Sequence, residues 1–361
     1  MFERRLHFHI DWAMLIAVMA LCFMGLVNIY SATGGPRGLY VTQIYGVVLG
    51  LIALAVCLAI DYRTLADKSH FIYGGVILLL VYVLFLGVVR GGSRRWIDLG
   101  PLNLQPSEFA KAALALVLAK FFADSRRGAI SRGDLLIAGA ITVVPLILIA
   151  RQPDLGTAVT LIPVLFAGAF VAGMPMRIFG IIALVGVLVA PLAWKFALQD
   201  YQKGRISTFL DPSQDAKGAG YQQIQARITV GSGGVWGKGF QKGTQGQLRF
   251  LPVAHNDFIF SVLAEEHGFV GVLVALGLYL FVILRALEAA ALAKDRLGSF
   301  LVLGVLASFT FQVVYNITMS AGLAPVKGLT LPLMSYGGSS MIATLAGFGL
   351  ILNVRMRRFT N

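Results

Sequence analysis

Long apolar runs alternate with short polar segments along the whole chain. Each run has about 20 residues, enough for an α-helix to cross the hydrocarbon core of a bilayer. The pattern predicts ten membrane-spanning helices in an all-α polytopic membrane protein. The predicted spans are 12–32, 41–60, 70–89, 106–123, 135–150, 156–173, 178–195, 269–288, 298–319 and 336–354.

Composition supports this class and leaves no room for a separate soluble domain. Of the 361 residues, 57% are hydrophobic and 13% are charged, and a soluble domain carries about twice that charged share. We therefore expect a single integral membrane domain over residues 1–361. Cys22 and Cys57 lie inside apolar runs, where they are expected to be buried thiols rather than a disulfide.

The net charge is +13. The distribution of the Lys and Arg residues among the loops predicts how the chain is oriented in the membrane. In a soluble protein this net charge would suggest nucleic acid, but basic residues in short loops orient membrane helices, and we expect no nucleic-acid partner. With both termini inside, the inner segments carry fifteen Lys and Arg residues and the short outer loops carry six. The sequence thus predicts both termini in the cytoplasm. Four segments are then outside: 90–105, 151–156, 196–268 and 321–337.

The outer segment 196–268 is a long extracellular loop between spans seven and eight. It is expected to contain an amphipathic helix at 221–230 and a glycine-rich run at 231–246 that cannot pack a core of its own. A loop of this length is functional or disordered. Lys238 and Trp236, interleaved with the glycines, favour function, and Lys238 is a candidate substrate-binding residue. The loop ends in a predicted short helix at 256–266, terminated by Gly268.

Asp257 is the candidate catalytic residue in this short helix. An acidic side chain at a helix start can also accept hydrogen bonds from the unpaired backbone amides and interact favourably with the helix dipole. A capping role is therefore the alternative. The helix dipole lowers the pKa of such an acid and apolar neighbours raise it, and the sequence leaves the balance open. His255 and Asn256 either orient the base or only cap the helix.

Other ionisable residues lie at or inside the predicted spans. Glu108 and Lys111 are three residues apart on one helix face, where they form either a structural ion pair or part of a functional cavity. Asp154 follows Pro153 in a tight turn, as a cap or as a site residue. Polar groups inside a membrane are costly, which favours a cavity for the first pair.

Two further segments are candidates for anion binding. Arg90, Arg94 and Arg95 precede Trp96. In one interpretation these residues lie at the membrane interface, with the arginine head groups in the aqueous phase. In the other, the arginines bind a phosphate and Trp96 stacks on a sugar or lines a groove. Glycines in 336–340 open the last span, where they cradle phosphate or allow close helix packing, and packing is favoured.

The chain has no metal-binding spacing and no nucleotide-binding glycine loop. A substrate used outside the cell must therefore arrive already activated, and a lipid pyrophosphate in the outer leaflet meets that condition. A divalent cation, Mg²⁺ or Mn²⁺, bridging the pyrophosphate stays open as a cofactor.

Four segments together resemble the SEDS family: 94–97 with 104–111, 152–157, 251–266 and 332–340. Their order and spacing match the family across nearly the whole chain. The resemblance implies a ten-span peptidoglycan glycosyltransferase of the bacterial inner membrane that polymerises lipid II. Residues 243–252 and the short N-terminal tail are most similar to the elongation, or rod-shape, branch of the family.

The resemblance also implies roles for individual residues. The catalytic aspartate of the family falls on Asp257, its functional tryptophan on Trp96, and its cavity pair on Glu108 and Lys111. Asn256 stands where threonine is usual, and Val253 where an acid is common. These departures leave Asp257 in place but weaken any assignment of the residues that orient it.

We expect Asp257 to act as the general base for inverting glycosyl transfer, with Lys111, Arg94 or Arg95 stabilising the leaving phosphate. One alternative is a flippase or transporter of the lipid-linked precursor, and another is a scaffold for a transpeptidase. The resemblance implies a class B penicillin-binding protein as partner.

Overall fold

The structure is a computed structural model that describes residues 9–36, 38–90, 93–100, 103–125, 130–196, 199–215, 218–248 and 250–359. Its helices are α1 (Trp12–Thr33), α2 (Gly38–Ala59), α3 (Tyr62–Asp67), α4 (Ser69–Leu86), α5 (Pro106–Asp124), α6 (Arg132–Arg151), α7 (Leu155–Val171), α8 (Met176–Phe196), α9 (Asp200–Leu210), α10 (Ala219–Ser232), α11 (Thr244–Gln247), α12 (Ile259–Ala291), α13 (Arg296–Ser320) and α14 (Gly338–Met356). Short 3₁₀ turns lie at Pro212–Asp215 and Arg357–Phe359.

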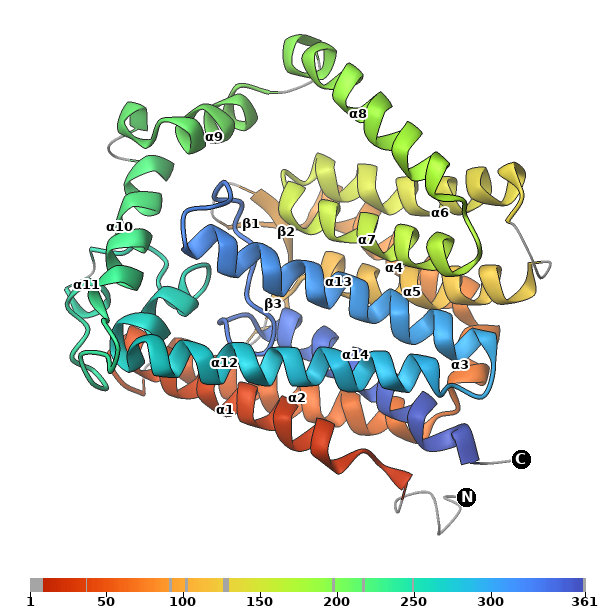
Figure 1. The fold of residues 1–361 in the computed structure, drawn as a ribbon, viewed down its shortest axis with the longest axis horizontal. Coiled ribbons are helices and arrows are strands. Elements are labelled where there is room, and N and C mark those ends of the chain that lie inside the picture. Colours follow the sequence, from red (N-terminus) through yellow and green to blue (C-terminus); the bar gives the residue numbers. More distant parts are fainter. Residues whose placement is uncertain are drawn as a thin grey trace.

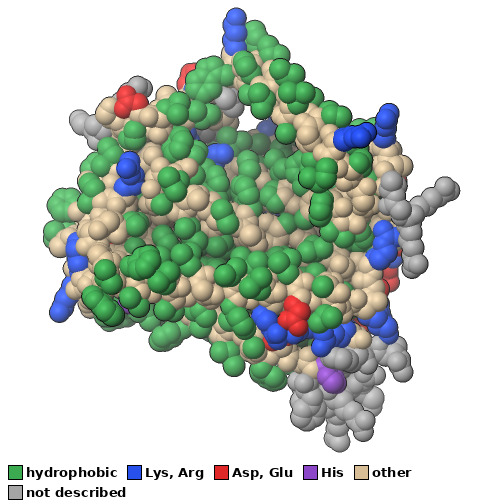
Figure 2. All heavy atoms as spheres, viewed as in Figure 1, with side chains coloured by type: hydrophobic (Ala, Val, Ile, Leu, Met, Phe, Trp, Pro, Cys, Tyr) green, Lys and Arg blue, Asp and Glu red, His purple; other side chains and the backbone are tan. Residues whose placement is uncertain are grey.

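The long helices form a bundle with an apolar surface (Figures 1 and 2). In the described part of the chain, eight helices are long and apolar enough to cross a membrane: α1, α2, α4, α6, α8, α12, α13 and α14. Each of the ten predicted spans falls on a helix, but α5, which carries four ionisable residues, and α7, which has 17 residues, lie outside that set of eight. The structure thus confirms a mostly helical, multi-pass membrane protein.

The core of the bundle lies around α13 and α14. Helix α14 packs against α2, and α13 packs against α5, α7 and α12. Most residues of α14 and α13 in their apolar windows are buried, whereas none of the residues of α8 whose burial the structure describes is buried. Figure 1 shows α8 leaning away from the bundle and leading to α9 and α10.

A small antiparallel sheet is added to the otherwise helical bundle. Strands β1 (Val88–Arg90), β2 (Ser93–Asp98) and β3 (Asn103–Leu104) pair in the order β1-β2-β3. Val88 lies opposite Trp96, and Ile97 lies opposite Leu104. The sequence did not indicate these strands, because segments this short are too brief for an alternating pattern to stand out.

The glycine-rich run packs closely, which also differs from expectation. Backbone hydrogen bonds join Lys238 N to Glu265 O (2.9 Å) and Phe269 N to Gly234 O (2.9 Å). The contact is possible because Gly268, with φ of 64°, interrupts α12 at this point. The run therefore has no core of its own, as predicted, but is held against α12. The predicted helix at 221–230 is confirmed within α10, and the predicted helix ending at Gly268 is the first part of α12.

The segments that carry the candidate site residues lie at one end of the bundle. The sheet, the turn between α6 and α7, the helices α9 to α11 and the loop between α13 and α14 lie toward the end opposite the termini (Figure 1). This end carries the candidate site.

Candidate active site

Asp257 lies just before α12 and does not cap it. The N-cap of α12 is Phe258, with no side-chain capping bond. The Oδ1 atom of Asp257 is buried and has no hydrogen-bond partner among the described residues. A buried carboxylate oxygen without a donor is costly in a purely structural group. The geometry therefore argues against the capping alternative.

The backbone around Asp257 is fixed by the loop between α13 and α14. The amide of Asn316, on α13, donates to the carbonyls of Asp257 (2.9 Å) and Leu329 (2.6 Å). The hydroxyl of Ser335 donates to Asn256 O (2.6 Å), and Tyr336 N donates to His255 O (2.9 Å). Three successive residues of the segment are thus held through their carbonyls, which leaves the Asp257 carboxylate uncommitted.

Burial raises the pKa of Asp257 to about 6, while the positive charges of Arg95 and Arg205 act in the opposite direction. The apolar surroundings disfavour the carboxylate, and the two cations keep the shift moderate. A carboxyl group that titrates near 6 is ionised at neutral pH and accepts a proton more readily than an ordinary aspartate. This balance, which the sequence left open, suits a general base.

A cavity of about 130 Å³ lies beside this segment. Arg95, Trp96, Glu108, Asn256 and Gly328 are among its lining residues. The Arg95 guanidinium lies 5.8 Å from the centre of the Trp96 ring. It also forms an ion pair with Asp154 (3.4 Å). Cationic and aromatic groups therefore meet at the cavity wall.

The neighbouring arginine points elsewhere. Arg94 is exposed, and its Nη1 donates to the Phe85 carbonyl at the end of α4 (2.7 Å). The side chain of Arg90 lies outside the described part of the structure. Of the predicted arginine clamp, Arg95 is therefore the member that the structure brings to the cavity.

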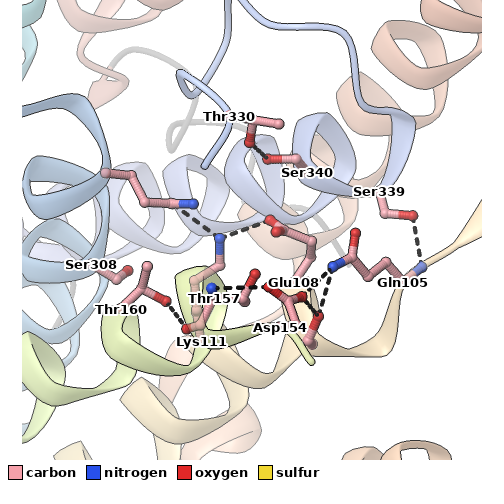
Figure 3. A network of polar contacts seen from close by, with 12 residues as sticks. Gln105, Glu108, Lys111, Asp154, Thr157, Thr160, Ser308, Thr330, Ser339 and Ser340 are labelled. Carbon is pink, nitrogen blue, oxygen red and sulfur yellow. Dashed lines mark hydrogen bonds and ion pairs between the residues drawn. The ribbon is translucent and has the colours of Figure 1, made fainter. Parts of the chain in front are cut away.

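Asp154 is the N-cap of α7 and a centre of polar contacts (Figure 3). Its carboxylate accepts from Thr157 N (3.2 Å) and from the amide of Gln105 (2.8 Å). The bond to Arg95 adds a link to β2. Asp154 is thus the cap that the sequence suggested, and it also contacts three residues that line the cavity.

Glu108 and Lys111 form an ion pair of 2.7 Å inside the bundle. They are 5% and 6% exposed, and Lys111 Nζ also donates to Gln312 Oε1 (3.0 Å) on α13. Glu108 lines the cavity, and both residues line a smaller one of about 30 Å³ beneath it. Figure 3 shows the pair side by side with the Asp154 network. Lys111 Nζ thus donates to Glu108 and to Gln312, and neither bond involves Asp257.

Two other predicted residues lie away from the cavity. His255 packs edge-on against Tyr336 at 5.6 Å, and burial lowers its pKa. It lines a separate groove of about 670 Å³ next to the α1–α2 loop. Lys238 forms an ion pair with the buried Glu265 (2.7 Å) and donates to Thr244. The structure thus places Lys238 in the contacts that hold the glycine-rich run.

The sequence did not single out four residues of this region. Asn316 and Gln312 are polar residues of α13 without any motif. Arg205, on α9, and Lys327, in the segment between α13 and α14, are single basic residues. Arg205 and Arg95 are the cations whose charges act on Asp257. Lys327 precedes Gly328, which lines the cavity. Only their approach in space identifies them, because their sequence neighbours carry no comparable signal.

The fold and the site define a multi-pass helical membrane protein with a buried carboxylate and cations at one end of its bundle. A model of the cell cycle protein family of FtsW, RodA and SpoVE matches residues 11–359. The chain belongs to this family, which confirms the resemblance seen in its motifs.

Two named relatives are similar to this chain over nearly its full length. The chain is 39% identical over 353 residues to the peptidoglycan glycosyltransferase MrdB of Escherichia coli K12, covering 97% of this chain and 94% of that protein. It is 31% identical to the peptidoglycan glycosyltransferase RodA of Treponema pallidum, covering 96% of this chain and 98% of that protein.

Solved structures match as well. A chain from a peptidoglycan synthase complex, studied for its coordination of polymerization and crosslinking, is 36% identical with a TM-score of 0.86, covering 98% of this chain and 99% of that chain. The rod shape determining protein RodA of Thermus thermophilus is 34% identical with a TM-score of 0.74, and 98% of each chain is covered.

Proposed function

We propose that this protein is a peptidoglycan glycosyltransferase that polymerises lipid II at the outer face of the bacterial cytoplasmic membrane, for cell elongation and shape. Lipid II is a disaccharide peptide linked to undecaprenyl pyrophosphate. The named activity of the full-length relatives supports the reaction. The observation that carries the proposal is Asp257. Its Oδ1 is buried and has no hydrogen-bond partner among the described residues, and its neighbour Asn256 lines a cavity together with Arg95 and Trp96.

In the proposed mechanism, Asp257 takes the proton from the 4-hydroxyl of the acceptor sugar as general base. The hydroxyl oxygen attacks the anomeric carbon of the donor, which is inverted, and the lipid pyrophosphate leaves with the electron pair of the broken bond. A pyrophosphate needs no proton to leave, so one carboxylate serves where an inverting glycosidase uses two.

The proposed topology is ten spans with both termini in the cytoplasm and residues 196–268 as an extracellular loop between spans seven and eight. In support, α5 and α7 run within the bundle beside the eight apolar helices, and the site segments lie at the end opposite the termini. Cysteine labelling from outside intact cells tests it. A cysteine at Gln214 is expected to react, and one at Lys294 is not.

We further propose a class B penicillin-binding protein transpeptidase as partner, in line with the synthase complex that the chain resembles. A Mg²⁺ or Mn²⁺ ion at the substrate pyrophosphate is also proposed. Asp257 would be the side chain of this site that helps to hold it, and the ion would supply positive charge to the leaving pyrophosphate. No three His, Cys, Asp or Glu side chains come together in the described regions.

The test is polymerisation by the purified protein in detergent, with lipid II as sole substrate. Glycan strands resolved on a gel are expected. A flippase or a scaffold would form none, because detergent offers no second compartment and a scaffold needs its partner for chemistry. Parallel reactions with Mg²⁺, Mn²⁺ or EDTA test the metal. Intact lipid II after incubation, with binding retained, would overturn the proposed function.

A further inference from the structure

Helix α2 carries a fully buried glutamine, Gln43, to which the mechanism proposed above gives no role. The buried residues of this helix are Gln43, Gly46, Val47, Gly50 and Leu54. Gln43 is 0% exposed, and a polar side chain inside an apolar bundle is costly unless it is hydrogen-bonded. An apolar residue would pack in this position without that cost. The amide group of Gln43 therefore needs an explanation beyond helix packing.

Both polar atoms of Gln43 bind the loop between α13 and α14. Its Oε1 accepts from Gly337 N (2.9 Å), and its Nε2 donates to Ser335 O (3.3 Å). Gly46 is three residues further along the same face of α2, and a Cβ on it would stand 2.8 Å from the Cα of Gly338. This close approach brings the Gln43 amide within reach of the loop just before α14 begins.

The same loop holds the segment that carries the proposed base. The Ser335 hydroxyl donates to Asn256 O (2.6 Å), and Tyr336 N donates to His255 O (2.9 Å). Gln43 is bonded to the residues on both sides of Tyr336. Three consecutive loop residues thus connect α2 to the two residues that precede Asp257.

The loop needs support because its backbone is strained. Leu333 has a φ of 68°, in the left-handed region that a leucine rarely adopts. A strained residue keeps its conformation only where its surroundings leave no alternative. Without the two bonds from Gln43, the loop can relax and displace the Ser335 hydroxyl. The segment that is bonded to this hydroxyl then moves with it.

We propose that Gln43 is a positioning residue for Asp257, which fixes the loop of residues 331–337 so that the loop holds the base in place. Gln43 acts through Ser335 and Tyr336. This role rests on the proposed function, because its kinetic readout is the reaction of the base. A general base must lie within hydrogen-bond reach of the hydroxyl that it deprotonates, and a displacement of about 1 Å lowers the rate strongly.

The test measures kcat and KM of the purified full-length protein in detergent, with lipid II as substrate. Gln43→Met keeps the length of the side chain but removes both bonds, and we expect kcat to fall about tenfold with KM little changed. Ser335→Ala should lower kcat by a similar factor. The double variant should lose no more than either single variant, because both changes break the same connection. A loss of about a hundredfold, the product of two independent effects, would overturn the route through Ser335.

The single variants decide the role of Gln43 itself. A wild-type kcat in Gln43→Met, or a raised KM with unchanged kcat, would overturn the positioning role. Gln43→Asn covers the case in which Gln43→Met does not fold. It keeps a buried amide but is one methylene shorter, so it cannot reach Ser335 O and Gly337 N together. The same loss of kcat is expected for it, and a wild-type kcat would overturn the role.

Asn353→Leu is the matched control. Asn353 is also 0% exposed, and its amide joins α14 to the other end of α2 by donating to Cys57 O (3.0 Å) and Leu58 O (2.8 Å). This variant should lower the thermal midpoint at least as much as Gln43→Met, with kcat near wild type. If it lowers kcat as much as Gln43→Met, any break between α2 and α14 slows the reaction, and the positioning role is overturned.

Hydrogen exchange gives a readout that does not depend on catalysis. The amides of Tyr336 and Gly337 should exchange faster in Gln43→Met than in the wild type, because their acceptors are displaced or removed. They should stay protected in Asn353→Leu. Unchanged protection in Gln43→Met would overturn the connection. If the wild type shows this protection but no polymerisation, the proposed function fails while the connection through Gln43 stands.

Discussion

At the scale of single residues, the chemistry of Asp257 results from two opposing effects. Burial among apolar groups raises its pKa, and Arg95 and Arg205 lower it, with a result of about 6. Its backbone is fixed by neighbouring hydrogen bonds while its carboxylate stays unpaired. Rigid support and a free functional group are what a general base requires.

The pKa of Asp257 predicts the pH dependence of polymerisation. The base works ionised, so kcat/KM should rise with pH and level off above about 6. Arg95→Gln removes a charge that lowers this pKa, so the acidic limb should move to higher pH. Arg94→Gln is the control, because Arg94 is exposed and bonded to Phe85 O. A limb that stays in place or moves to lower pH in Arg95→Gln contradicts the electrostatic explanation.

Asn316 is predicted to position Asp257. Asn316→Ala removes two hydrogen bonds to the carbonyls of Asp257 and Leu329. Misplacement of the base should lower kcat at least about tenfold, with KM for lipid II little changed.

Asn28 provides the matched control, because it is equally buried and donates only to Met24 O of its own helix. Asn28→Ala should leave kcat near wild type. Comparable losses of kcat in both variants would mean that any buried asparagine of the bundle matters, and would remove the positioning role.

At the scale of elements, the interruption of α12 organises the end of the bundle opposite the termini. Gly268 leaves the helical conformation, and the backbone of residues 234–239 forms hydrogen bonds with the backbone of residues 265–270 around this break. Glu265, with no exposed surface, accepts from Lys238, Thr244 and the amide of Gln245. The glycine-rich run and the segment that carries Asp257 are therefore parts of one packed unit.

Gly268→Ala is predicted to disrupt this unit. A Cβ at Gly268 would overlap the backbone of Gly237 and Val235, and φ of 64° disfavours any side chain. We expect a loss of about 2–4 kcal/mol in stability, seen as a lower thermal midpoint, together with loss of polymerisation. Gly277→Ala, on the same helix with open space around it, should be neutral or slightly stabilising. Equal midpoints for the two variants would refute the close-packing argument.

At the scale of the whole molecule, buried polar contacts join the helices that carry the site. Lys111 links α5 to α13 through Gln312, and Asp154 links α7 to β2 and to the start of α5. These contacts lie within an otherwise apolar bundle, where an unpaired charge would lower the free energy of unfolding. The site therefore depends on the relative placement of at least three helices.

Breaking the buried pair should destabilise the whole bundle. Glu108→Gln leaves Lys111 without its carboxylate, at a cost of about 3–5 kcal/mol. Replacing both, as Glu108→Gln with Lys111→Met, should recover much of this. The exposed Lys120–Asp67 pair is the control, and Asp67→Asn should cost less than about 1 kcal/mol. Thermal unfolding in detergent measures all three, and a midpoint of Glu108→Gln equal to that of Asp67→Asn would disprove the argument.

The apolar pattern was sufficient to predict the helices, because each membrane crossing needs a continuous run that is visible in one segment of sequence. It could not predict the sheet, because strands of two to six residues have no periodic signal. The motifs led to Asp257, Trp96 and Glu108. Arg205 and Asn316 were missed because their importance depends on contacts between segments more than 50 residues apart, which no local pattern encodes.

The most direct test of the central claim is the rate of lipid II polymerisation by purified Asp257→Asn in detergent. Asparagine keeps the size of the side chain but cannot take a proton. We expect the rate to fall at least about a hundredfold, with lipid II binding and the thermal midpoint close to wild type. Polymerisation at the wild-type rate would show that Asp257 is not the base and would contradict the account.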